Sequence, residues 1–331
     1  MMDSLSKLGV CFQLARAAAC IASVGSAAPV LAQDAYPSRP VKVIINSSPG
    51  GLTDVVGRLV TTKMGQALGQ QFVVENRSGA PVVGADALAK AAPDGYTIGV
   101  LGNSLSALPA MNPNLPFSPT KDLVPIALLN SSQLVLVTAT RSPYRSVADF
   151  VAEAKAKPSQ LAFASGGNAT MGHLLAEQLQ ASAGISLVHV PYKGGAPAMA
   201  DLLAGHVPVF FDTVGTTVPL AREGKVRALA VAGSRRSTVL PDVPTLAEAG
   251  YADVQGTGWF AMFAPARTPP EIVVRLNAEA NKALQSPDVK ERLQSLGTNV
   301  EGGSPGVLAD LLGTEIPRWT KLIRDRNINT N

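Results

Sequence analysis

The stretch VKVIINSSPGGLTD, residues 41–54, decides the fold, because an apolar run passes through two glycines into an amphipathic segment. It predicts a buried strand, a glycine turn and a helix that continues from Val55 and is capped by Thr53 or Asp54. The start of such a helix leaves backbone N–H groups unpaired and aimed at one point, which suits an anion. Gly50 and Gly51 permit positive φ and let a ligand approach the backbone.

This turn does not match the known nucleotide-binding signatures. It contains no lysine, so it is not a phosphate loop of the form G-x-x-x-x-G-K-[ST], and it does not read G-x-G-x-x-G. Taken alone, it is most simply a tight strand-to-helix connection. A second stretch, ASGGNATMGHLLAEQL (164–179), repeats the arrangement: a strand, a glycine turn and a helix started by Thr170. The sequence therefore predicts two backbone anion cradles, neither of which contains a basic residue in its turn.

Composition limits the possible classes of protein. The chain of 331 residues is long enough for two domains, and its 46% hydrophobic residues can form a large core. Charged residues make up 16%. The net charge of +4 is small for this length, and no block of Lys and Arg alternates with aromatic residues. Nucleic acid is therefore excluded as an expected partner.

Residues 1–32 have the pattern of a cleavable secretory signal. Lys7 and Arg16 precede an apolar stretch, 17–31, that closes on small residues at Ala32. Gly25 and Pro29 interrupt the stretch, which makes it short and broken for a membrane anchor. We expect cleavage after Ala32 and an exported, soluble product.

Both cysteines, Cys11 and Cys20, lie inside this segment. The processed chain would then contain no disulfide, no thiol nucleophile and no zinc site built on cysteine. No metal and no cofactor are expected.

After Tyr36 the chain alternates between strand and helix patterns, which predicts an α/β fold with mainly parallel sheets flanked by helices. The apolar runs 124–129 and 134–138 are expected to be separate strands with the first domain crossing between them, and 259–263 carries the chain back. Residues 109–122, rich in Pro and Asn, are expected to form a loop, and Ser146 with Asp149 forms a capping-box pattern that opens a helix. The expected lobes are 33–132 with 262–331, and 133–261.

The site candidates lie at the ends of strands, where ligands gather in open α/β sheets. If the two cradles face one another, the cleft would hold a small molecule with one or two carboxylates. Asp212, at the end of the run 207–211, could accept a hydrogen bond from the ligand or cap the strand end. The candidate ligand-binding residues are Ser47, Ser48, Gly50, Gly51, Thr53, Asp54, Asn103, Ser104, Ser165, Gly167, Asn168, Ala169, Thr170 and Asp212.

Enzymatic activity is less well supported by the residues. The histidines at 173, 189 and 206 are scattered, none lies in H-E-x-x-H, and G-x-S-x-G is absent. A triad of Ser48, His173 and Asp212 can be drawn, but a lone histidine in the first turn of a helix is more often a packing residue. Two alternatives to a transport receptor stay open: a secreted hydrolase or isomerase on the same scaffold, and a sensor that presents its closed form to a membrane kinase.

Five motifs together resemble one family: YPSRPVKVII with PGGLTD, AKAAPDGYT, HVPYKGGAPAMADLLAGHV and LPDVPTLAEAG. They are similar to those of the tripartite tricarboxylate transporter receptors, also called the Bug family of periplasmic solute-binding proteins, from about Tyr36 to Trp319. The resemblance implies a two-lobed receptor of the type II class, periplasmic and monomeric, that closes on a carboxylate and delivers it to transporter subunits in the membrane through a transient contact. The ligand would be held mainly by backbone groups and waters of two loops, 46–54 and 165–170.

The chain departs from the family pattern at both loops. Asn46-Ser47 stands where Pro-Phe is usual, and Ala169 stands where Gly is usual. The first change makes the expected pocket wall more polar and less bulky. The identity of the solute, a mono- or dicarboxylate that is aliphatic or aromatic, is therefore not carried over from the family.

Overall fold

The computed structural model describes residues 36–47, 49–77, 81–326 and 328. The fold below is that of Arg39–Asn331, which forms one unit. The expected secretory signal, both cysteines and Ser48 lie outside the described residues. Among the helices that the structure describes, none combines the length and apolar character needed to cross a bilayer.

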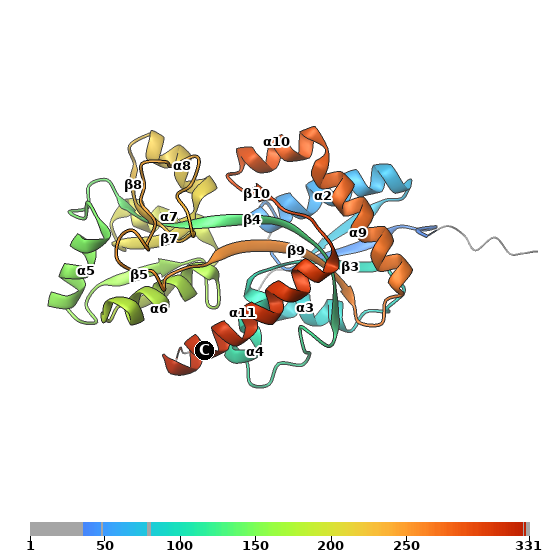
Figure 1. The fold of residues 1–331 in the computed structure, drawn as a ribbon, viewed down its shortest axis with the longest axis horizontal. Helices are drawn as coiled ribbons and strands as arrows, with labels where there is room; N and C mark the ends of the chain where they lie inside the picture. The colour runs from blue at the N-terminus through green and yellow to red at the C-terminus, as the bar shows by residue number, and fades with distance from the viewer. Residues whose placement is uncertain (1–35, 48, 78–80, 327, 329–331) are drawn as a thin grey trace, which may run out of the picture. The chain divides into compact units, whose positions relative to one another are not determined.

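Strands and helices alternate along most of the chain, as the sequence predicts (Figure 1). The strands are β1 (Val41–Ile45), β2 (Phe72–Asn76), β3 (Thr97–Gly102), β4 (Leu123–Ala139), β5 (Ala162–Ser165), β6 (Val188–Pro191), β7 (Val209–Thr213), β8 (Val226–Val231), β9 (Thr257–Pro265) and β10 (Asn299–Val300). The helices are α2 (Leu52–Leu68), α3 (Pro81–Ala89), α4 (Ser104–Met111), α5 (Val147–Ala156), α6 (Met171–Ala183), α7 (Gly195–Ala204), α8 (Val214–Arg222), α9 (Pro270–Gln285), α10 (Pro287–Ser295) and α11 (Pro305–Asp325).

The strands join in the order β2-β1-β3-β9-β4-β7-β5-β6, and both β8 and β10 pair with β4. We call β1, β2, β3, β9, β10 and the first part of β4 sheet A, and the last part of β4 with β5 to β8 sheet B. The outer pairs, β1 with β2 and β3, and β5 with β6 and β7, are parallel. The pairs of β4 and β9 are antiparallel, because these strands run between the sheets in opposite directions. The α/β class is confirmed, and its sheets are mixed.

The crossing near residue 130 is one continuous strand, and the prediction of two separate strands is wrong. β4 runs for 17 residues, and its polar middle, Asn130 to Gln133, pairs with β9 from Phe260 back to Thr257. Past Leu134 the same strand pairs with β7 and β8 in sheet B. The polar residues looked like a break, but the backbone hydrogen bonds to β9 keep the segment extended.

Three further elements escaped the sequence analysis. α4 covers Ser104–Met111 and accommodates Pro109, where a loop was expected from residue 109, while α8 and the short β10 were not predicted at all. The capping box before α5 is confirmed, since the Ser146 hydroxyl accepts from the Asp149 N–H and the Asp149 carboxylate accepts from the Ser146 N–H.

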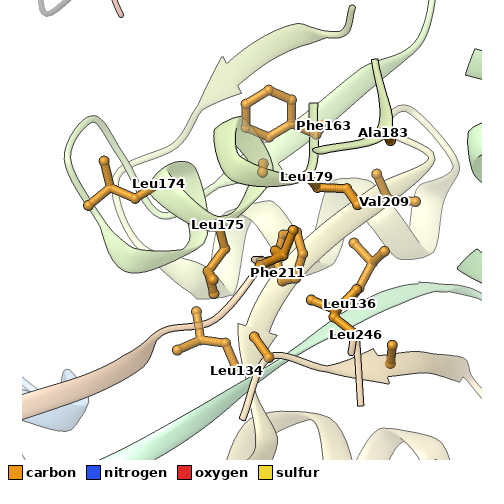
Figure 2. Close-up of a cluster of buried hydrophobic side chains, with 14 of the residues drawn as sticks. Leu134, Leu136, Phe163, Leu174, Leu175, Leu179, Ala183, Val209, Phe211 and Leu246 are labelled. Atoms are coloured by element: carbon orange, nitrogen blue, oxygen red, sulfur yellow. The ribbon is translucent and has the colours of Figure 1, made fainter. Parts of the chain in front are cut away.

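Each sheet has its own core. In sheet B, Leu134 and Leu136 of β4 pack with Phe211 of β7 and with leucines of α6, including Leu175 and Leu179 (Figure 2). A second cluster covers sheet A and contains Trp259 and Phe263 of β9. Burial of these side chains stabilises each sheet by roughly 1.5 to 3 kcal/mol per large residue.

Helix α11 belongs to both cores. Leu308 and Leu312, near its start, lie in the sheet A cluster, while Trp319 and Ile323, near its end, lie in the sheet B cluster. Figure 1 shows it in red beside α4, which it contacts. Between the two ends, the buried Glu315 accepts hydrogen bonds from Trp259 Nε1 at 2.9 Å and from the Ser106 hydroxyl at 2.8 Å. Burial raises the pKa of this carboxyl despite those bonds.

We expect Trp319→Ala to lower the free energy of unfolding by about 3 to 5 kcal/mol, because it opens a cavity at the joint between α11 and the sheet B core. The milder Ile323→Val should cost about 1 kcal/mol. Urea unfolding measures both. Val307→Ala, on the exposed face of the same helix, is the control and should change stability by less than about 0.5 kcal/mol. A Trp319→Ala protein as stable as this control would contradict the packing described.

Candidate functional site

Strand directions bring both predicted cradles to the junction of the two sheets. β1 is parallel to β3, and both β3 and β4 are antiparallel to β9, so β1 and β3 run in the direction of β4, from sheet A toward sheet B. β7 is antiparallel to β4 and parallel to β5, so these two strands run the opposite way. The carboxyl ends of β1 and β3 therefore point toward sheet B, and those of β5 and β7 point toward sheet A.

The first cradle connects β1 to α2. Gly50 has φ +79°, and Gly51, with φ −66° and ψ 159°, is the N-cap of α2. The prediction of a cap at Thr53 or Asp54 is wrong, since both residues lie inside the helix and are buried. The Asp54 carboxylate instead reaches back and accepts a hydrogen bond from the Gly50 N–H at 2.9 Å.

Asp54 is held by two more side chains. Its Oδ1 accepts from Arg58 Nε at 2.9 Å and from Asn76 Nδ2 at 2.8 Å, and Asn76 also donates to the Ser47 carbonyl at 3.1 Å. Burial tends to raise the pKa of Asp54, but the hydrogen bonds from Gly50, Arg58 and Asn76 outweigh it and lower the pKa. The Asp54 side chain thus holds the turn in shape. The Gly50 N–H is already used in the hydrogen bond to this carboxylate.

Helix α3 closes against the start of the same cradle. A Cβ atom on Gly84 would lie 2.7 Å from the Cβ of Asn46, so only glycine allows this approach. Asn46 and Ser47 are partly buried beside it. Asn46, the first of the two residues where the family usually has Pro-Phe, is therefore packed against α3.

The second cradle connects β5 to α6 and is built around the Ser165 hydroxyl. This group is fully buried, accepts from the Gly167 N–H at 3.1 Å, contacts the Gly167 carbonyl at 3.0 Å and lies 2.6 Å from His189 Nε2. The Thr170 hydroxyl donates to the same carbonyl at 2.8 Å. Both hydroxyls, predicted as ligand donors, therefore bond within the turn and shape it.

Two stacked histidines support this turn. The rings of His173 and His189 lie 3.8 Å apart, and Phe163 stacks on His189 at 4.8 Å. His173 Nδ1 accepts from the N–H of Ala169, which has φ +62°, at 3.3 Å. Burial lowers the pKa of His173 to about 3, with help from His189, and burial lowers the pKa of His189 to about 4. Both rings are neutral near pH 7, which suits the acceptor role of His173.

The loop between β6 and α7 packs on the second cradle and was missed by the sequence analysis. The Gly194 N–H donates to the Gly166 carbonyl at 3.1 Å, and a Cβ on Gly167, which has φ +131°, would lie 3.2 Å from the Tyr192 carbonyl. The partly buried Asn168 lies in the same turn. The motif that contains Gly194 pointed to this segment, but its role in supporting the turn depends on β6 lying beside β5.

The Asp212 carboxylate, near the end of β7, bonds to residues at the start of α8. It accepts hydrogen bonds from the Thr216 hydroxyl and the Thr213 N–H. Burial raises its pKa to about 6 even though these bonds oppose the shift. Gly195 lies beside it, since a Cβ there would be 3.6 Å from Asp212 Oδ1.

Two asparagines at the junction have amide groups without partners among the described residues. Asn103 follows β3, its N–H donates to the Trp259 carbonyl, and its Nδ2 is buried without an acceptor. Asn130, in the middle of β4, is completely buried with neither amide atom bonded. Asn103 was predicted, with Ser104 next to it opening α4, whereas Asn130 was hidden in a stretch expected to be a break. Unpaired buried amides are costly, which marks both as candidate ligand or water contacts.

A hollow lies elsewhere in the described part of the chain. It has a volume of about 590 Å³ and is lined from α10, β10 and the segment after β8. None of the described residues predicted to bind ligand lines it. In the part of the chain that the structure describes, no group of His, Cys, Asp and Glu has the arrangement of a metal site.

Replacing His173 by Phe should lower the free energy of unfolding at pH 7 by about 1 to 3 kcal/mol, because the ring volume stays but the buried Ala169 N–H loses its acceptor. The difference from the wild type should narrow below pH 6.5. Between pH 6.5 and about 3, His173 is protonated in the unfolded wild type but not in the folded wild type. The wild type therefore loses stability as the pH falls through this range, and the Phe variant does not. Urea unfolding across this pH range measures it. His206→Phe, on the exposed surface, is the control; an equal effect in both variants would contradict the role.

Replacing Asp212 by Asn should change the pH dependence in the opposite sense. Because the folded pKa of about 6 exceeds the ordinary 3.8, the folded wild type binds the proton more tightly and loses stability as the pH rises from about 4 to 6. Asn cannot ionise, so the variant should gain about 1 to 3 kcal/mol relative to the wild type over that interval. Unfolding free energies at pH 4, 5, 6 and 7 test this, and a constant difference would refute it.

Comparison with known proteins places these features in context. The family model described as tripartite tricarboxylate transporter family receptor matches residues 56–328. BugT of Bordetella pertussis is 40% identical over 92% of this chain and 94% of its own length.

Solved structures agree in fold. MatC from Rhodopseudomonas palustris, with bound malate, has a TM-score of 0.80 and 36% identity over 87% of this chain and all of its own. A second R. palustris protein, solved with adipate, has a TM-score of 0.82 and 32% identity over 89% of this chain and 99% of its own.

Proposed function

The chain belongs to the tripartite tricarboxylate transporter receptor family, and we propose that it binds a small organic carboxylate at the sheet junction and delivers it to a tripartite membrane transporter. The family and its structural neighbours are periplasmic solute-binding receptors and not enzymes, so the hydrolase or isomerase alternative is set aside. The same relatives support a periplasmic location, and we propose that residues 1–32 are the cleaved export signal.

One observation carries the proposal: two glycine turns, each at the start of a helix, stand at strand ends that point toward one another. Backbone N–H groups and helix dipoles at both ends favour a negatively charged group between them. Asn103 Nδ2 at the end of β3, which has no acceptor among the described residues, adds a side-chain donor. We propose that Gly51, Asn103 and Asn168 contact the solute. Gly167 and Ala169 shape the second cradle in this proposal, because their N–H groups already bond to Ser165 and His173.

The other predicted residues take supporting roles in this proposal. The buried side chains of Asp54, Ser165 and Asp212 bond to their own loops, so we propose that they hold the cradles in shape. A backbone cradle reads charge and shape, so the chemical variety of solutes among relatives, malate for one and adipate for another, is consistent with one scaffold. We propose that the solute is a di- or monocarboxylate. The first lobe would consist of 33–132 and 262–331, and the second of 133–261. The two lobes of a monomer would close on the solute.

A thermal-shift screen with malate, adipate and benzoate tests the class of solute. Saturation at about 100 times Kd stabilises the folded state by about 2.7 kcal/mol, which raises the unfolding temperature measurably. Carboxylates should stabilise the protein, and glucose and neutral amides of the same acids should not. A screen in which no carboxylate acts, or in which the amides act equally, would count against the proposal.

Gly51→Val tests the first cradle. The φ of −66° at Gly51 is allowed for valine, so the substitution demands no left-handed backbone, and we expect the side chain to fill space near the helix start. We expect calorimetry to show affinity for the best carboxylate of the screen falling by about a hundredfold, or about 2.7 kcal/mol. Gly313→Val, at an open exposed position of α11, is the matched control and should bind normally. Equal affinities in both variants would rule out this cradle.

A further inference from the structure

The polar hollow noted above shares no lining residue with either cradle. Its volume is about 590 Å³, within the range of about 300 to 1,000 Å³ that is usual for small-molecule sites. It is lined by Val214 of α8, by Gln133 of β4, by the segment 235–239 after β8, and by residues of α10 and β10.

The charge of the lining is positive. Arg235, Arg236 and Lys290 are its charged members, and no acidic residue lines it among those that the structure describes. Arg236 is held by Glu248 at 3.0 Å and by the Pro241 carbonyl. Neither Arg235 nor Lys290 forms an ion pair with a carboxylate of the described residues, so both cations are available to an anion at the hollow.

The rest of the lining supplies polar groups at fixed positions. Gln133 Nε2 donates to the Arg235 carbonyl at 2.9 Å, which ties the segment 235–239 to β4. Thr298 is buried, and its hydroxyl bonds to the Leu293 carbonyl at 3.0 Å. Gln294 and Asn299 offer exposed amides beside them. Gln133, Thr298 and Asn299 thus fix the wall through bonds within the protein, so an anion would be held mainly by the cations.

The walls come from both sheets. Lys290 and Gln294 on α10, with β10, belong to the sheet A side, while Arg235 and Val214 belong to the sheet B side. The two sides touch next to the hollow, where a Cβ on Gly215 would lie 1.7 Å from the Leu296 carbonyl and a Cβ on Gly297 would lie 2.3 Å from the Gly215 Cα. An anion held by Arg235 and Lys290 would therefore bridge the two sides.

We propose that this hollow is a second binding site, for a small multivalent anion of the phosphate or polycarboxylate type, and that the anion ties α10 to the segment 235–239. The site shares none of its residues with the proposed carboxylate cradles. The proposal therefore stands whether or not the cradles bind the solute.

Inorganic pyrophosphate is the probe, because it is multivalent and lacks the carboxylate that the cradles are proposed to read. Amide resonances of residues 235–239 and 297–300 should shift saturably on titration at low ionic strength. The double variant Arg235→Gln/Lys290→Gln should weaken the apparent affinity by about tenfold or more, since two charge-assisted contacts are lost. Gly51→Val, which alters the first cradle, should leave the titration unchanged.

Lys121→Gln/Lys155→Gln is the matched control, because it removes two exposed positive charges that line neither site. This variant should bind pyrophosphate as the wild type does. The proposal is overturned if both double variants lose affinity equally, if shifts spread over the basic surface without saturating, or if Arg235→Gln/Lys290→Gln binds normally. Native-like amide spectra of the free variants establish that each is folded.

Discussion

The backbone hydrogen bonding between β4 and β9 is the constraint on which the rest depends. These antiparallel strands stay paired from Leu123 opposite Pro265 to Gln133 opposite Thr257, and β4 then continues into sheet B. Because the pair fixes the direction of every neighbouring strand, it sets which strand ends meet at the junction. Strand direction therefore brings the two glycine turns to the same junction, and the glycines determine their local shape.

Much of the fold could be predicted from the sequence because its signals are local. The apolar run 41–45 and the pair Ser146 and Asp149 each determine structure within a few residues, and both predictions agree with the structure. β4 could not be predicted as one strand, because Asn130 to Gln133 are held extended by a partner more than 120 residues away. Pro109 likewise suggested a loop, although α4 accommodates it.

The candidate site shows the same division. The glycine turns and the helices that follow them could be predicted from the sequence. The sequence could not show which polar side chains face a ligand and which bond to their own loop. Asp54 and Ser165 proved to be internal, because their partners, Asn76 and His189, come from neighbouring strands. The stacked histidines are a tertiary product of β5, β6 and α6 lying together, and no spacing in the sequence marks them.

Helix α11 adds a mechanical consequence. One helix packs at one end beside Leu308 and at the other beside Trp319, in two different hydrophobic clusters, with Pro317 between them. A change in the angle between the sheets would have to be accommodated by the side chains packed around at least one end of α11. The packing of both sheets is therefore linked through the two ends of this helix, and a substitution at either end affects the core of one sheet directly.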